Sequence, residues 1–230
     1  MNKIKFPWIV CLGIAALALI SLACVCPLTD LADEFINDSG DSPGDAGGSV
    51  LLKDDFSSSN SGWEVGEFVD GDVGYGNGYY FVKSAEINKT IWGVAGKNYT
   101  DVVIDIDASQ TSAGPDNNND YGVACRVQEN GDGYYLLISG DGYYSIFKGA
   151  GDTFTPLSDW EESGDINQGN ANNHIQASCI GSDLVLMVNG KTLASASDSD
   201  FPNGDIAMTA TTYENQPVEV HFDNVAVTKP

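Results

Sequence analysis

Beyond about residue 50, short apolar segments are separated by clusters of Gly, Asp, Asn and Ser. Within many of these segments apolar and polar residues alternate, which is the period of a β-strand with one buried face. No apolar repeat of helical period with capping residues follows. The predicted strands are Val50–Phe56, Trp63–Val69, Tyr79–Lys83, Ile87–Trp92, Asp101–Ala108, Tyr121–Gln128, Tyr134–Ser139, Tyr143–Lys148, His174–Ile180, Leu184–Asn189, Thr192–Ala196, Ile206–Thr212 and Val218–Thr228.

Two pairs of these segments are connected by residues typical of β-hairpin turns. Gly140, Asp141 and Gly142 connect the first pair, and Asn189 with Gly190 connects the second. About a dozen antiparallel strands in a single domain favour an all-β fold, an antiparallel two-sheet sandwich or jelly roll.

The first 24 residues have a different pattern. Lys3 and Lys5 precede an uncharged, mostly apolar stretch of 16 residues, Trp8–Ala23, which Cys24 follows. A membrane-spanning helix needs about 20 apolar residues, so this length is more typical of a signal peptide. The segment resembles a bacterial lipoprotein signal, in which Cys24 becomes the lipidated N-terminus. An uncleaved anchor is the alternative, because the apolar residues continue to Leu28.

The chain is therefore expected to have three parts: a signal peptide at 1–23, a lipidated N-terminus with a flexible tether at 24–50, and a β-sandwich domain at 51–230. The tether ends in a Gly-, Ser- and Asp-rich spacer. Both basic residues near the apolar stretch precede it, which orients the N-terminus inward. The expected location is the extracytoplasmic face of the bacterial cell membrane, where the lipid is the anchor.

The expected mature chain is strongly acidic. Residues 1–23 contain two of the ten Lys and Arg residues, so eight basic and 33 acidic residues remain, a formal charge of −25. Such a surface repels phosphate backbones, which excludes nucleic acid as a partner. Two interpretations stay open: a solvated acidic surface, or divalent cations bound by clustered carboxylates.

The expected location outside the cytoplasm bears on the cysteines of the domain. Cys125 and Cys179 are the only cysteines inside the predicted domain. For two such residues outside the cytoplasm, a disulfide is the default expectation.

Several segments resemble the concanavalin A-like sandwich domains of bacterial surface lipoproteins, whose architecture laminin G-like and glucanase-like jelly rolls share. The segments are DDFS, GVACRVQ, GYYLLIS, DGYYSIFK, LSDW, NNHIQASC, LVLMVNG and FDNVAV. The resemblance covers about 51–230 and implies the fold. It does not identify one function, because this fold carries lectins, glycosidases and adhesion modules.

A glycosidase needs two carboxyl groups on one face. Glucanase-like relatives carry Glu-x-Asp-x-x-Glu on a strand, and the nearest match here begins at Asp105, continues through Asp107 and ends at Gln110. Both glutamates are replaced, so we expect a solvated strand face and no catalytic residues. The histidines, His174 and His221, are far apart in the sequence.

The candidate ligand-binding residues are Arg126, Tyr135, Tyr144 and Trp160. If Cys125 faces the core, alternation puts Arg126 on an outer sheet face, where its guanidinium could bind sugar hydroxyls. Tyr135 and Tyr144 are assigned to the same outer face, with Trp160 in a bordering loop. Structural roles are the alternative for all four residues.

We therefore expect a lipid-anchored, non-catalytic module that binds a neutral glycan or another cell-surface component. A divergent glycoside hydrolase and a purely structural envelope protein are the alternatives. The acidic surface should disfavour sulfated or uronate-rich glycans.

A structural Ca²⁺ is a further expectation. Asp54, Asp55 and Asp223 flank DDF and FDN, which the family resemblance puts on neighbouring terminal strands. Carboxylate oxygens suit Ca²⁺ better than zinc. The alternative is surface aspartates without a metal.

Overall fold

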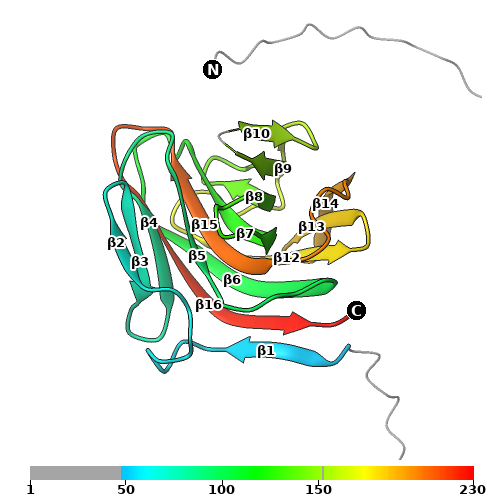
Figure 1. Cartoon of the computed structure of the whole chain (residues 1–230). Coiled ribbons are helices and arrows are strands. Elements are labelled where there is room, and N and C mark those ends of the chain that lie inside the picture. Colours follow the sequence, from blue (N-terminus) through cyan, green and yellow to red (C-terminus); the bar gives the residue numbers. More distant parts are fainter. Residues whose placement is uncertain (1–47, 152) are drawn as a thin grey trace, which may run out of the picture. The chain divides into compact units, whose positions relative to one another are not determined.

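The alternating segments form sixteen β-strands in the computed structural model, which describes residues 48–151 and 153–230 (Figure 1). No helix occurs in this described part. Accordingly, none of its segments is a helix long and apolar enough to cross a membrane. The predicted signal peptide, Cys24 and the tether as far as residue 47 lie outside the described residues.

The strands belong to two antiparallel sheets. Sheet A contains β1 (Val50–Asp54), β2 (Gly66–Phe68), β3 (Gly71–Tyr75), β4 (Tyr80–Ser84), β6 (Val102–Ser112), β12 (Asn172–Ile180), β13 (Asp183–Val188), β14 (Lys191–Ser197) and β16 (Val218–Thr228). Its order is β14-β13-β12-β6-β16-β4-β3-β2, and β1 pairs with β16. Sheet B contains β5 (Thr90–Val94), β7 (Asn119–Val127), β8 (Gly133–Ser139), β9 (Tyr143–Ala150), β10 (Thr153–Pro156), β11 (Glu161–Glu162) and β15 (Asp205–Thr212). Its order is β10-β9-β8-β7-β15-β5, and β11 pairs with β9.

The core lies between the two sheets because alternate side chains of each strand are apolar and point to one side. On β6, Ile104 and Ile106 are buried, while Asp105 and Asp107 on the opposite side are partly exposed. The predicted all-β, two-sheet sandwich is confirmed.

Each of the thirteen predicted segments overlaps a strand, with shifted ends in most cases, but β3, β10 and β11 were not predicted. β3 has the sequence GDVGY, whose glycines break the apolar alternation. β10 and β11 are short and exposed along their whole length. These three strands depend on pairing with a neighbour, which their own sequences do not indicate.

Two local predictions are confirmed. Asn189 and Gly190, between β13 and β14, both have positive φ angles, of 50° and 79°. Only residues that tolerate this conformation fit such a turn. Cys125 of β7 and Cys179 of β12 form a disulfide, so one covalent bond joins sheet B to sheet A.

Candidate functional site

The outer face of sheet B, away from the core, carries an unusual number of apolar side chains. The register aligns one row of them across five neighbouring strands, and together with nearby residues they form a second apolar cluster outside the core. The members of the row, from β5 to β9, are Val94, Ala207, Ala124, Tyr135 and Phe147. A solvated sheet face is normally polar, but most of these side chains are buried, so other segments of the chain cover much of this face and leave Trp92, Val94 and Phe147 partly exposed.

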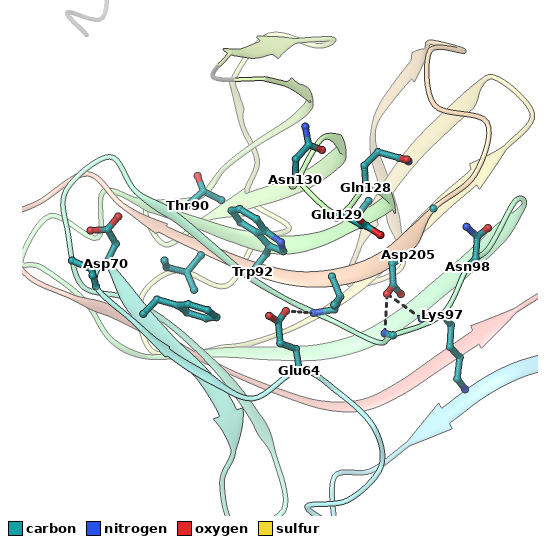
Figure 2. A pocket seen from close by; sticks show the side chains of 17 residues that line it. Glu64, Asp70, Thr90, Trp92, Lys97, Asn98, Gln128, Glu129, Asn130 and Asp205 are labelled. Carbon is teal, nitrogen blue, oxygen red and sulfur yellow. Dashed lines mark hydrogen bonds between the residues drawn. The ribbon is translucent and has the colours of Figure 1, made fainter.

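A groove of about 1150 Å³ lies at the β5 end of this face. It is bounded by β5, by the turn between β2 and β3, by the turn at residues 128–132 between β7 and β8, and by the segment around Asp205. Figure 2 shows Trp92 among the lining residues, with Glu64 below it, Glu129 to its right and Asn130 above it.

Trp92 is the large aromatic side chain of this groove. Its register partner on β15 is Thr209, and its ring belongs to the apolar cluster of the outer face. The side chain is only partly buried, and its indole Nε1 donates no hydrogen bond within the described part of the chain. An indole ring with an exposed surface and an unused N–H donor is suited to binding a ligand.

The turn at residues 128–132 packs directly against Trp92. A Cβ atom on Gly131 would come within 2.6 Å of Cζ2 of Trp92, so the ring and the turn backbone are in close contact. Gly131 has a φ of +84°, a conformation that glycine adopts without strain. The hydroxyl of Tyr135 donates a hydrogen bond to the carbonyl oxygen of Gly131 at 2.5 Å, which anchors the turn from below.

Two carboxylates on the groove wall stabilise its backbone. Oδ2 of Asp205 accepts hydrogen bonds from the amides of Gly96 and Lys97 at 2.8 and 3.0 Å. Burial raises the pKa of Asp205, and these amide bonds lower it in part. Oε2 of Glu64 lies 3.4 Å from the amide of Val94, at the open edge of β5. The groove therefore has a fixed wall beside Trp92.

Of the predicted ligand-binding residues, Arg126 does not face outward. A β-bulge leaves Arg126 unpaired between Cys125 and Val127, with a φ of 55°, and the side chain is only 2% exposed. Its guanidinium donates hydrogen bonds to the carbonyl oxygens of Thr100 and Phe201 and to the carboxylate of Asp101. The prediction was wrong because a bulge interrupts the alternation on which it rested.

Tyr135 lies on the predicted face but is fully buried there. The turn at residues 128–132 covers it, and the ring of Phe154 packs against it with centroids 4.9 Å apart. Tyr135 therefore positions the turn that contacts Trp92, and it has no surface for a sugar.

Tyr144 points into the core, on the same side of β9 as Ile146, and donates a hydrogen bond to Glu161 at 3.0 Å. Its assignment to the outer face was wrong, because the adjacent Tyr143 has that orientation. Trp160 is 38% exposed, and its ring centroid lies 5.6 Å from that of Phe147. As a ligand contact Trp160 stays a prediction, at the end of the face opposite to β5.

The expected calcium ligands lie near the paired terminal strands, since Asp54 of β1 is the register partner of Val225 on β16. Asp54 accepts hydrogen bonds from the Phe56 amide and from Nε1 of Trp63, and Asp55 accepts from Ser57. Within the described ranges, no group of three or more His, Cys, Asp or Glu side chains is arranged to hold a metal ion. A calcium ion at Asp54, Asp55 and Asp223 stays a prediction.

The strand that resembles the glucanase motif lies in sheet A. Asp105 and Asp107 point to its outer face, and His174 on β12 bridges them at 3.4 and 2.9 Å. Gln110 points to the opposite side and is buried. The three motif positions therefore do not converge on one face.

The groove was not predicted from the sequence. Trp92 was the last residue of a predicted strand, and nothing in that segment indicated that its ring faces a hollow. The other walls come from segments between 64 and 205 that are far apart along the chain. The aromatic residues selected from the sequence were Tyr135, Tyr144 and Trp160 instead.

The two antiparallel sheets define the class: this is a concanavalin A-like jelly roll. Among solved structures, the chain is similar to a β-glucanase from Bacillus licheniformis, with a TM-score of 0.57 and 13% identity over 81% of this chain and 100% of that one. It is also similar to the carbohydrate-binding module CBM66 from Bacillus subtilis, with a TM-score of 0.53 and 15% identity over 74% and 96% of the two chains. The carbohydrate recognition domain of Emp47p has a TM-score of 0.52 and 14% identity, with 81% and 99% covered. No protein-family model and no curated protein sequence matches the chain.

Proposed function

We propose that this protein is a non-catalytic glycan-binding module that a lipid on Cys24 holds at the extracytoplasmic face of a bacterial membrane. The groove beside β5 is the binding site, and a glycan without acidic groups is the ligand. The observation that carries the proposal is Trp92, a partly exposed indole with an unpaired Nε1 in a groove whose walls are fixed.

The chemistry of the groove suits a sugar. Sugar rings present C–H faces, which pack on the electron-rich face of an aromatic ring, while their hydroxyls need donors and acceptors at the periphery. Around Trp92, the exposed side chains of Asn98 and Asn130 provide amides, and Thr90 provides a hydroxyl. Solved structures with this fold include carbohydrate-binding modules and glycoside hydrolases, which supports a glycan over other ligands.

The test is a glycan array probed with the full-length protein in detergent, followed by calorimetric titration of the best ligand. Trp92→Ala should weaken binding about tenfold or more, because it removes the central aromatic contact. Ile180→Ala, which truncates an exposed apolar residue of sheet A, should leave the affinity unchanged.

Trp160→Ala distinguishes the two ends of the outer face. Loss of binding in this variant, with full affinity in Trp92→Ala, would move the site to the β9 end. Absence of binding by the wild type across a broad array would contradict the proposal.

A further inference from the structure

Carboxylates surround Trp92 on several sides of the groove. Four acidic residues contribute to the lining and only one basic residue, Lys97, does so. In Figure 2 the Lys97 side chain extends away from Trp92, while Glu64 lies below the indole and Glu129 to its right. The groove therefore has a negative field around an aromatic ring.

The four acidic residues differ in how many hydrogen bonds and ion pairs their carboxylates make within the protein. Three backbone amides bond to the Asp205 carboxylate, and one approaches Glu64. Glu129, in contrast, is exposed and has no hydrogen-bond or ion-pair partner within the described residues. Asp70 has only a long contact of 3.9 Å to Lys89, between two well-exposed side chains. Glu129 and Asp70 thus remain available to a ligand.

Glu129 is held close to the aromatic ring by the chain itself. It belongs to the turn at residues 128–132, whose Gly131 is in contact with Trp92. The amide of Gly131 donates to the carbonyl oxygen of Gln128 at 2.9 Å, and the amide of Gln128 donates to that of Asp132 at 2.8 Å. Because Glu129 belongs to the same hydrogen-bonded turn as Gly131, the backbone itself holds the Glu129 carboxylate near the indole of Trp92.

An aromatic face with nearby carboxylates favours a cation. The ring quadrupole attracts an ammonium group, and a carboxylate at the periphery adds a charge-assisted hydrogen bond. A neutral sugar gains the aromatic contact and ordinary hydrogen bonds but no charge attraction, and an anionic sugar is repelled.

We infer that the glycan bound in this groove carries free, protonated amino groups, as an oligosaccharide of N-deacetylated amino sugars does. This inference rests on the proposed glycan-binding function and specifies the ligand class for the same site. One sugar ring packs on the indole of Trp92, and the ammonium group of that sugar lies between the Glu129 carboxylate and the indole. Asp70 contacts a second sugar unit of the oligosaccharide.

The test compares two tetrasaccharides that differ only in acetylation: the tetramer of glucosamine and the tetramer of N-acetylglucosamine. Calorimetric titration at mildly acidic pH, with the amines protonated, should give about tenfold tighter binding of the glucosamine tetramer at low salt. High salt should reduce this preference, since the charges are close to solvent. The double variant Asp70→Asn, Glu129→Gln should bind the two tetramers within about threefold of each other.

Two controls test whether the preference for the glucosamine tetramer arises in the groove or from the negative charge of the whole protein. Glu162→Gln neutralises an exposed acid of β11 outside the groove and should keep the full preference. Tetralysine has ammonium groups but no sugar ring to pack on Trp92, so it should bind more weakly than the glucosamine tetramer. If tetralysine binds as tightly and Trp92→Ala abolishes it, the ligand is a cationic peptide and the inference is wrong.

The remaining outcomes distinguish this inference from the proposed function. The amine preference would be overturned if both tetramers bind with equal affinity, or if only other neutral glycans bind. The proposed glycan-binding function would still hold in either case, provided that Trp92→Ala abolishes the binding. An equal loss in Glu162→Gln and in the double variant would also overturn the amine preference. Failure of every glycan to bind would overturn both.

Discussion

Asp120 shows how much one residue's surroundings change its chemistry. It lies on the outer face of sheet B, yet it is only 2% exposed, because the hydroxyl of Tyr213 donates a 2.6 Å hydrogen bond to it and covers it. Its Oδ1 has no hydrogen-bond partner within the described residues. Burial raises the pKa of Asp120 to about 6, although the bond from Tyr213 lowers it in part.

This raised pKa predicts the pH dependence of stability. Between about pH 4 and pH 6 the unfolded chain releases the Asp120 proton while the folded protein retains it, so the contribution of Asp120 to the free energy of unfolding falls as the pH rises. The loss of this contribution amounts to about 3 kcal/mol at most and is nearly complete at about pH 7. Asp120→Asn should therefore be more stable than the wild type at pH 7, by about 1–3 kcal/mol, with the difference vanishing below pH 4.

Urea denaturation across this pH range measures the difference. Asp116→Asn, which changes an exposed acid near the start of the same strand, should alter stability by less than about 0.5 kcal/mol. Parallel pH profiles for the wild type and Asp120→Asn would contradict the expectation.

At the scale of elements, β7 and β12 hold the two sheets together. Cys125 and Cys179, 54 residues apart, are fully buried and covalently linked across the core. A link between the two sheets restricts the unfolded chain, because it closes a long loop.

Replacing both cysteines, Cys125→Ala with Cys179→Ala, should lower the free energy of unfolding by about 2–4 kcal/mol. Reductant should lower the urea midpoint of the wild type toward that of the double variant and leave the double variant unchanged. A wild-type midpoint that does not respond to complete reduction, verified by thiol titration, would disprove this stabilisation.

At the scale of the whole molecule, the proposed lipid anchor would hold a strongly acidic protein at a membrane surface. A formal charge of −25 after removal of 1–23 disfavours binding to anionic lipids, so surface charge cannot provide the attachment. Stable attachment requires two acyl chains, since one gives only marginal affinity.

Cys24→Ser should therefore shift the protein from the membrane fraction to the medium, or leave the unprocessed chain in the membrane. Cell fractionation with mass spectrometry of the N-terminus measures both outcomes. Cys26→Ser is the matched control and should behave like the wild type. A Cys24→Ser protein that is processed and retained normally would rule out the lipoprotein interpretation.

The fold was largely predictable from the sequence because its information is local. Alternation identified segments such as β6 and β12, and Asn189 with Gly190 identified a turn whose φ angles few other residues tolerate. The inward parity of Cys125 and Cys179 likewise follows from their neighbours, and the disulfide between them is present.

What the sequence by itself determined, then, is the all-β class, most strands and which side of a regular strand a residue faces. Only the tertiary structure decided what covers each side. A bulge turned Arg126 away from solvent, and the turn at residues 128–132 buried Tyr135. The same turn, with β5 and the segments around Glu64 and Asp205, made Trp92 the centre of a groove. Strand parity depends on the nearest residues, whereas exposure depends on bulges, turns and contacts between separate segments, such as those around Glu64, Trp92 and Asp205, which strand alternation does not encode.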